Sequence, residues 1–315
     1  MRLQRSIPIL MTAVLNIGTV SAQEVSSTTT SERQSLQDAW WTGPLLADSA
    51  ATLPPGHFLI EPYIYDVIGS DTHALGSRVY LLYGLADRFS VGAVPIVGYN
   101  VVANGAGSPR LKSGDIAVLA QYQFTQFHEQ GWVPTTAVRI QETFPTGTYD
   151  RLGTRYSDGL GAGAYTTTIS FNTQSYFWLP SGRILRFRFN VAQSFSSGVE
   201  VEGASVYGTT NDFRGRAMPG RSFTVNAAGE YSITRNWVLA LDAIYQHHEN
   251  TRVIGTQDGM PLRVDTGTSW AFGVAPAIEY NFSPTLGVIA GALVIGPGHN
   301  SSRSVAPILA INYVH

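Results

Sequence analysis

Short segments in which apolar and polar side chains alternate recur along the chain from Phe58 to its C-terminal end. In the stretch RILRFRFNVAQSF, Arg183–Phe195, the apolar side chains fall on one parity, and Arg186 and Arg188 fall on the other. A period of two is that of a β-strand with one apolar and one polar face. A soluble sandwich would turn the apolar face toward a core. A membrane barrel would turn it toward lipid and turn the arginines toward the lumen.

The connections between these segments favour the membrane barrel. They alternate between tight turns such as GLADR and long polar loops such as ENTRVIGTQDGMPLRVDTG. Short periplasmic turns and long external loops are typical of an antiparallel transmembrane β-barrel, so we predict this all-β fold with about 12 strands. The predicted strands are Phe58–Val67, Arg78–Tyr83, Phe89–Tyr99, Ile116–Phe124, Thr135–Phe144, Gly159–Phe177, Arg183–Phe195, Phe223–Ile233, Trp237–His247, Ser269–Phe282, Leu286–Gly296 and Ser304–Val314.

The composition excludes several other classes of protein. Charged residues make up 13% of the 315 residues, about half the share of an ordinary soluble domain. Beyond the N-terminus there is no apolar run of about 18 residues, the length that a membrane-spanning helix needs. The formal net charge of -2 provides no basic surface for nucleic acid, so no nucleic-acid partner is expected. The chain has no cysteine and therefore no thiol chemistry.

The first 57 residues divide into an export signal and a lead-in to the barrel. Residues 1–22 have Arg2 and Arg5, an apolar run and a small-residue end, which indicates a secretory signal peptide. Residues 23–57 are predicted to be either a periplasmic lead-in or a plug, in which Trp40 and Trp41 close the periplasmic mouth. Residues 58–315 are the predicted barrel. Export of a barrel predicts the bacterial outer membrane as its location, with outer-membrane lipid and the barrel-assembly machinery as partners.

Charged residues on the inward parity are the candidate functional residues. A charge that faces lipid costs about 2–4 kcal/mol at the bilayer midplane, so these side chains are predicted to face the lumen. They are Glu61, Arg139, Arg186, Arg188, Glu230, Asp242 and Glu279. Two interpretations stay open. A ladder that includes Arg188, Glu230 and Asp242 forms a constriction that selects polar or anionic solutes, or the charges pair to fill and stabilise a narrow barrel.

Small inward residues leave space on two of the predicted walls. They are Ala271, Gly273, Ala275 and Ala277 on one strand and Ser90, Gly92 and Gly98 on another. Such a lumen can admit a ligand, or it can receive the N-terminal segment.

Four stretches carry a resemblance to a known family: GPLLADSAATLPPGHFLIEPY, YGLADRFSVG, GDIAVLAQYQF and FPTGTYDRLGT. With them the chain, from about residue 43 to its end, resembles the outer-membrane β-barrel family named for the meta-pathway of phenol degradation. The resemblance implies an outer-membrane barrel that passes aromatic or other hydrophobic compounds. Barrels of this kind usually finish on Phe or Trp, whereas His315 ends this sequence, which weakens the assembly signal.

The predicted function is an outer-membrane channel or transporter for passive passage of small molecules, with no enzymatic activity and no cofactor. The alternative is a structural or lipid-modifying barrel, a hydrolase. Its support is weak, because His299 and Ser301 are merely neighbours in a predicted loop, and no acid partner accompanies them. No metal site is expected, since His247 and His248 point to opposite faces of one strand.

Overall fold

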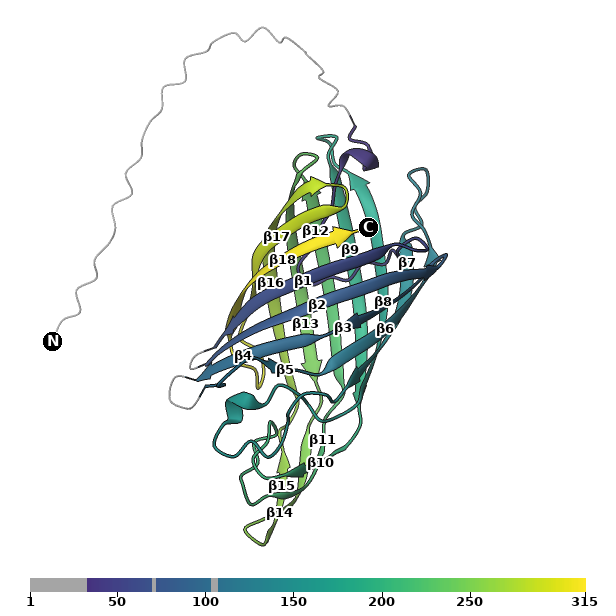
Figure 1. Cartoon of the computed structure of the whole chain (residues 1–315). Helices are drawn as coiled ribbons and strands as arrows, with labels where there is room; N and C mark the ends of the chain where they lie inside the picture. The colour runs from purple at the N-terminus through teal and green to yellow at the C-terminus, as the bar shows by residue number, and fades with distance from the viewer. Residues whose placement is uncertain (1–32, 70–71, 103–106) are drawn as a thin grey trace, which may run out of the picture. The chain divides into compact units, whose positions relative to one another are not determined.

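The structure, a computed structural model, describes residues 33–69, 72–102 and 107–315. The predicted signal peptide lies outside this range. The main element is a closed antiparallel barrel of 12 strands (Figure 1). Its strands are β1 (Phe58–Ile68), β2 (Thr72–Ala86), β3 (Phe89–Val94) with β4 (Ile96–Val102), β6 (Ile116–Thr125), β7 (Thr135–Phe144), β8 (Thr166–Trp178), β9 (Ile184–Ser196), β12 (Ser222–Ser232), β13 (Trp237–His248), β16 (Ser269–Ser283), β17 (Leu286–Ile295) and β18 (Ser304–Val314).

The barrel closes through β1, which pairs with β2 on one side and with β18 on the other. β3 and β4 are two parts of one barrel strand, separated at Pro95. Proline has no N–H to donate to a neighbouring strand, which explains the break. β2 continues past it and pairs with β3 and β4 in turn, so the wall stays continuous there.

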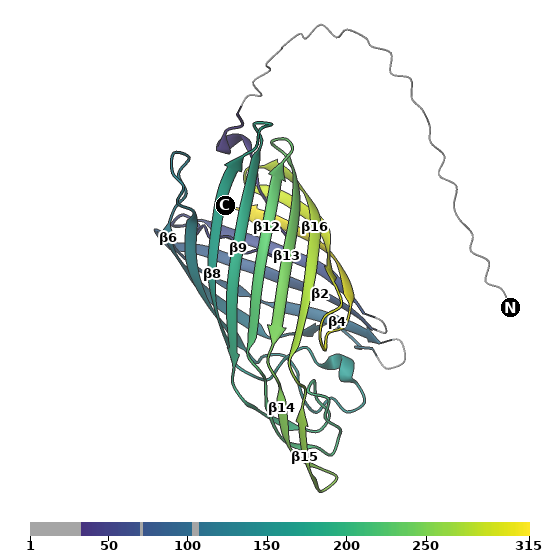
Figure 2. The ribbon, with the colours of Figure 1, turned by 180° about the vertical axis from the view of Figure 1, so that it is seen from behind.

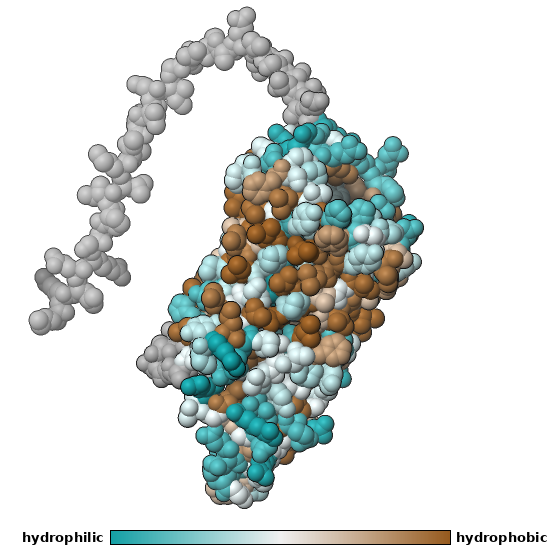
Figure 3. All heavy atoms as spheres, in the orientation of Figure 1, coloured by the Kyte–Doolittle hydropathy of each residue, from teal (hydrophilic) through white to brown (hydrophobic). Residues whose placement is uncertain are grey.

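The outer surface is the apolar one, as predicted for a membrane barrel. Figure 3 shows brown hydrophobic surface across the middle of the barrel face in view, with hydrophilic surface beyond it at both ends. On β9, Phe187 is 39% exposed, whereas its neighbours Arg186 and Arg188 are each 6% exposed. The apolar parity of the stretch Arg183–Phe195 therefore faces lipid and its arginines face inward. Burying the apolar band in hydrocarbon is the main favourable term for such a surface.

The predicted strand bounds hold closely, with two informative differences. Thr135–Phe144 and Ser304–Val314 match β7 and β18 residue for residue. β2 begins six residues before its predicted start at Arg78, because Thr72–Ser77 lacks alternation but still pairs with β1 and β4. β8 begins at Thr166 instead of Gly159, because loop residues before it are tied elsewhere: the N–H of Ala162 donates to Asp115 Oδ2 at 2.7 Å.

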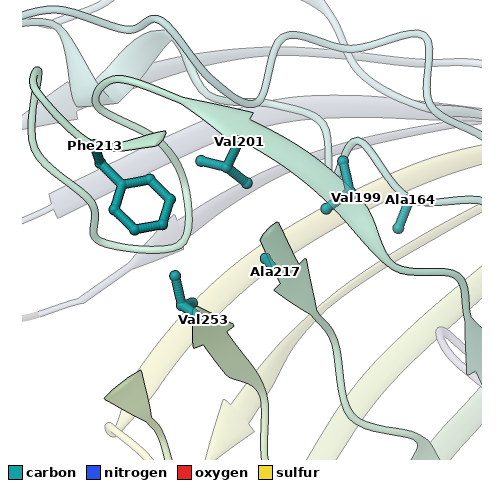
Figure 4. Packing of buried hydrophobic residues seen from close by; sticks show 6 residues of the cluster. All are labelled: Ala164, Val199, Val201, Phe213, Ala217 and Val253. Atoms are coloured by element: carbon teal, nitrogen blue, oxygen red, sulfur yellow. The ribbon is translucent and has the colours of Figure 1, made fainter. Parts of the chain in front are cut away.

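The long external loops form a second, smaller sheet that the sequence did not predict. Its strands are β10 (Val199–Glu202), β11 (Arg214–Met218), β14 (Arg252–Gln257) and β15 (Met260–Asp265), paired in that order. Figure 2 shows β14 and β15 beyond the barrel end, in line with β13 and β16. One face of the sheet buries a small apolar cluster (Figure 4), formed by Ala164, Val199, Val201, Phe213, Ala217 and Val253.

Three short elements complete the described part: the 3-10 turns η1 (Leu36–Asp38) and η2 (Tyr156–Asp158), and the two-residue strand β5 (Lys112–Ser113). Among the described residues, no helix is long and apolar enough to cross a membrane.

Candidate functional site: the barrel lumen

The chain that precedes β1 crosses the lumen. We call residues 40–53 the lumenal segment. At its start, the N–H of Trp40 donates to the carbonyl of Arg235, in the short turn between β12 and β13. At its end, the N–H of Leu53 donates to Ser90 Oγ on β3 at 2.9 Å. β12 and β3 lie on different sides of the barrel in the strand order, so the segment spans the interior.

Two buried carboxylates hold the first part of the lumenal segment. Glu279 Oε2 on β16 accepts from the N–H of Thr42 at 2.7 Å, and Asp242 Oδ1 on β13 accepts from the N–H of Ala47 at 2.9 Å. Both carboxylates have no measurable exposure. Backbone N–H groups without a regular ladder need such acceptors, because a buried unpaired N–H is costly. These two side chains therefore supply the hydrogen-bond acceptors that a neighbouring strand would supply to a regular β-strand.

Side chains of β7 and β9 hold the middle of the segment. Arg188 Nη1 donates to the carbonyl of Ala47 at 2.8 Å, and Asn190 Nδ2 donates to the carbonyl of Asp48 at 3.1 Å. The carboxylate of Asp48 pairs with Arg139 Nη1 at 2.6 Å. The two predicted lumenal arginines Arg139 and Arg188 thus bind the segment directly.

The last part of the segment is bound by amide side chains of β6. Gln123 Oε1 accepts from the N–H of Thr52 at 3.0 Å. Gln121 Nε2 donates to the carbonyls of Ser49 and Ala51 at 3.1 and 3.3 Å. These contacts are all between neutral groups, each worth about 1 kcal/mol net. This end of the segment is therefore held less firmly than the end at the buried carboxylates.

Small residues on the wall make room for the segment. A Cβ atom at Gly287 would lie 2.1 Å from Thr42 Oγ1, so only glycine fits there. Leu45 packs against Ala275, one of the small inward residues, together with Ile289 and Ala310. The space that the sequence leaves at Ala275 is thus occupied by the chain's own N-terminal segment.

The predicted ladder of opposite charges exists in part. Arg186 Nε donates to Glu230 Oε2 at 2.6 Å, Arg186 Nη2 binds Oε1, and Arg188 Nε lies 3.4 Å from Oε2. Asp242 was expected to join this ladder, but it binds the N–H of Ala47 and Asn226 Nδ2 instead. These two neutral donors occupy Asp242 Oδ1, and within the described residues Asp242 forms no ion pair with an arginine.

Both tryptophans of the hypothesised plug lie at the periplasmic end of the lumen and are half-buried. The guanidinium of Arg186 stacks over the ring of Trp41 at 4.6 Å, and that of Arg235 lies over Trp40 at 5.6 Å. The ring of Tyr176 lies 6.3 Å from that of Trp41. Cation–π contacts of this kind fix the rings against the wall.

Two hollows flank the end of the lumenal segment. A vestibule of about 610 Å³ is lined by Trp41, Gln123, Phe127 and Tyr176, among others. An inner cavity of about 210 Å³ lies between the segment and the wall of β1, β2 and β6. Residues 51–53 line both hollows. A stretch of three residues thus forms part of the wall of each.

Glu61, the remaining predicted site residue, lines the inner cavity and accepts from Asn312 Nδ2 at 2.9 Å. The polar residues Ser90, Asn190, Asn281 and Asn312 also contact the segment or the cavity, and none was among the predicted site residues. Their inward parity is visible in the sequence, but the high cost of facing lipid that assigns a charged side chain to the lumen does not apply to neutral amides and hydroxyls. Within residues 33–69, 72–102 and 107–315, no group of three or more metal-binding side chains gathers.

The protein is a transmembrane β-barrel of the bacterial outer membrane, as its closed fold, its apolar outer band and its polar lumen indicate. The chain belongs to the family described as "Putative MetA-pathway of phenol degradation", whose sequence profile matches residues 44–296.

Two solved structures resemble this chain at low sequence identity, and the first of them shows the shared fold. An outer membrane channel from Pseudomonas putida F1 superposes with a TM-score of 0.63 and 13% identity, over 86% of this chain and 100% of that one. The toluene transporter TodX of Pseudomonas putida matches with a TM-score of 0.43 and 13% identity, over 88% of this chain and 94% of that one. No curated protein sequence matches this chain.

Proposed function

We propose that the barrel is a passive channel for small molecules and that the lumenal segment is its gate. The observation that carries this proposal is the position of residues 51–53, which line both the periplasmic vestibule and the inner cavity. Displacement of this stretch would join the two hollows into one passage. The structure then represents the closed state.

The bonds that hold residues 51–53 suit a gate. They are neutral side-chain bonds to Ser90, Gln121 and Gln123, and water can replace each of them at little net cost. The stretch has no strand partner of its own, so its release breaks no β-ladder. In contrast, the bonds from Glu279 and Asp242 anchor the other end. The segment would swing about the anchored end and open at the free one.

The proposed solutes are aromatic or other hydrophobic compounds. Leu59, Leu82 and Leu119 give the inner cavity an apolar wall, and the family description refers to phenol degradation. The competing hypothesis of a constriction for anionic solutes is less well supported. Arg186 is bound to Glu230, and Arg139 is bound to Asp48, so neither arginine offers a free charge to an anion.

We propose no catalytic activity for this barrel. The candidate pair for a hydrolase, His299 and Ser301, lies in the loop between β17 and β18. The imidazole Nε2 of His299 lies 3.3 Å from Asn300 Nδ2, with no acidic residue bonded to it in the part of the chain described. Insertion by the barrel-assembly machinery, and a role for residues 23–57 as one periplasmic unit, also stay predictions.

A reversible covalent lock tests the gate. The double substitution Leu53→Cys with Ser90→Cys cross-links the end that is proposed to open, because the backbone N of Leu53 lies 2.9 Å from Ser90 Oγ, and the sequence has no other cysteine to compete. In planar bilayers the oxidised protein should conduct less than the same protein after reduction. Proteins that carry only one of the two substitutions should have the same conductance before and after reduction. Absence of any conductance in the reduced and unmodified proteins would reject the channel, and equal conductance before and after reduction would reject the gate.

A further inference from the structure

The inner cavity is large enough to hold a molecule with one ring. Its volume is about 210 Å³, and an apolar cavity of about 150 Å³ is enough to hold benzene. Leu45 and Leu53 of the lumenal segment form one side, and Leu59, Leu82 and Leu119 of the wall form the other. Apolar walls on two opposing sides favour a flat apolar body between them.

One end of the cavity is polar, and the carboxylate of Glu61 is a hydrogen-bond acceptor there. Its Oε1 binds Asn312 Nδ2 at 2.9 Å, and no ion pair within the described chain includes it. The other charges at this end already have partners. Asp48 pairs with Arg139, and Arg188 binds Glu230 and the carbonyl of Ala47.

The mixture of charges selects for a neutral ligand. An anion would meet the carboxylates of Glu61 and Asp48, and a cation would meet the guanidinium groups of Arg139 and Arg188. In a site shielded from water, such like-charge contacts are unfavourable. A neutral hydroxyl, in contrast, can donate to Glu61 while its ring lies between the leucines.

We propose that the inner cavity binds one small neutral molecule that has a single apolar ring and a hydroxyl group donated to Glu61. This proposal rests on the channel function above and specifies the solute that the channel holds when closed. The hydroxyl gives selectivity, because a ring without a donor leaves the buried carboxyl group of Glu61 with one hydrogen bond fewer.

Calorimetric binding to the full chain in detergent tests the proposal, with phenol, toluene and benzoate as probes. Phenol should bind at one site, toluene at least about tenfold more weakly, and benzoate not measurably, as expected for one hydrogen bond to a charged or buried acceptor. Equal affinities for phenol and toluene, tighter binding of benzoate, or no binding of phenol would each overturn it.

Two variants locate the site. Leu82→Phe fills the cavity and should abolish phenol binding, while Leu81→Phe, its lipid-facing neighbour on β2, should leave it unchanged. Glu61→Met should weaken phenol about tenfold and spare toluene, because it removes the acceptor and keeps the length. Binding that survives Leu82→Phe would place phenol elsewhere and reject the site.

Conductance measured on the same preparations separates this proposal from the proposed function. A conducting barrel that binds no phenol rejects the ligand site and leaves the channel intact. A barrel that binds phenol but never conducts rejects the channel and leaves the site.

Discussion

Arg186 and Glu230 face each other directly across β9 and β12, and the guanidinium of Arg186 binds both carboxylate oxygens of Glu230. Both side chains are buried, and the same guanidinium also covers the ring of Trp41. The pair therefore joins two strands of the wall to the lumenal segment. This geometry favours a structural role for the two residues. The guanidinium of Arg186 is already bound by Glu230 and by the ring of Trp41, so it is poorly placed to select solutes.

Loss of one partner of this pair should destabilise the barrel. Arg186→Ala leaves the carboxylate of Glu230 buried with only Arg188 nearby, which should lower the free energy of unfolding by about 3–5 kcal/mol. Urea unfolding in detergent, followed by tryptophan fluorescence, measures the change. Arg214→Ala, on the exposed external sheet, is the matched control and should unfold like the unmodified protein. Indistinguishable unfolding of Arg186→Ala would show that the pair contributes nothing to the wall.

Deletion of increasing parts of the lumenal segment should raise conductance in two steps. Deletion of residues 24–41 takes away Trp40 and Trp41 but leaves Thr42 and Ala47 bonded to Glu279 and Asp242. Deletion of residues 24–50 takes away those bonds as well. Single-channel recordings should therefore show a modest increase for the first variant and a larger one for the second. If both variants conduct like the full chain, the segment does not obstruct the passage.

The external sheet should depend on Phe213. This side chain has no measurable exposure and belongs to the apolar cluster that includes Val201 and Val253. Phe213→Ala should weaken that sheet by about 3–5 kcal/mol, the usual cost of removing a buried ring. Trypsin should then cleave after Arg214 or Arg216 in intact proteoliposomes. Phe272→Ala, on the lipid-facing wall, should leave this cleavage unchanged, and resistance of the Phe213 variant would argue against a cluster that orders the loops.

The barrel could be predicted from sequence because its signal is periodic. Alternation over Ser304–Val314 specifies strand, length and face together, since a shift of one residue would put polar side chains into lipid. The external sheet has no such signal. Val199 and Val201 give only two apolar positions in β10. This strand pairs with β11 of the same loop, and β11 pairs in turn with β14 of another long loop. Pairing of short strands across long loops depends on tertiary contacts that a local pattern does not contain.

The lumen was predicted in its charges, whereas the N-terminal segment was only one of two occupants that the sequence left open. Arg139 and Asp242 could be assigned to the interior because lipid excludes charge. Their partners, Asp48 and the N–H of Ala47, lie in an irregular segment without periodicity. Which wall such a segment meets is decided by individual hydrogen bonds, and Gln121 and Gln123 gave no sequence signal beyond their inward parity.

The β14–β15 hairpin should loosen in acid because of Asp265. Its carboxylate accepts from Asn250 Nδ2 at 2.8 Å, from Arg263 Nε at 2.9 Å and from Arg252 Nε at 3.0 Å. These bonds, that of Asn250 first, hold the pKa of Asp265 well below its usual value. A depressed pKa in the folded state means that the stabilisation is complete above the ordinary aspartate pKa and is lost as the pH falls below it.

Hydrogen exchange of the amides in residues 252–265, corrected for intrinsic rates, measures this loss. Protection should be high at neutral pH and should fall at about pH 3, below the ordinary aspartate pKa. Asp265→Asn should show low protection at both pH values, because its amide cannot bind two arginines as an anion does. Asp258→Asn, at the tip of the same hairpin, should respond to acid like the unmodified protein. A hairpin whose protection does not change with pH would show that the Asp265 bonds do not order it.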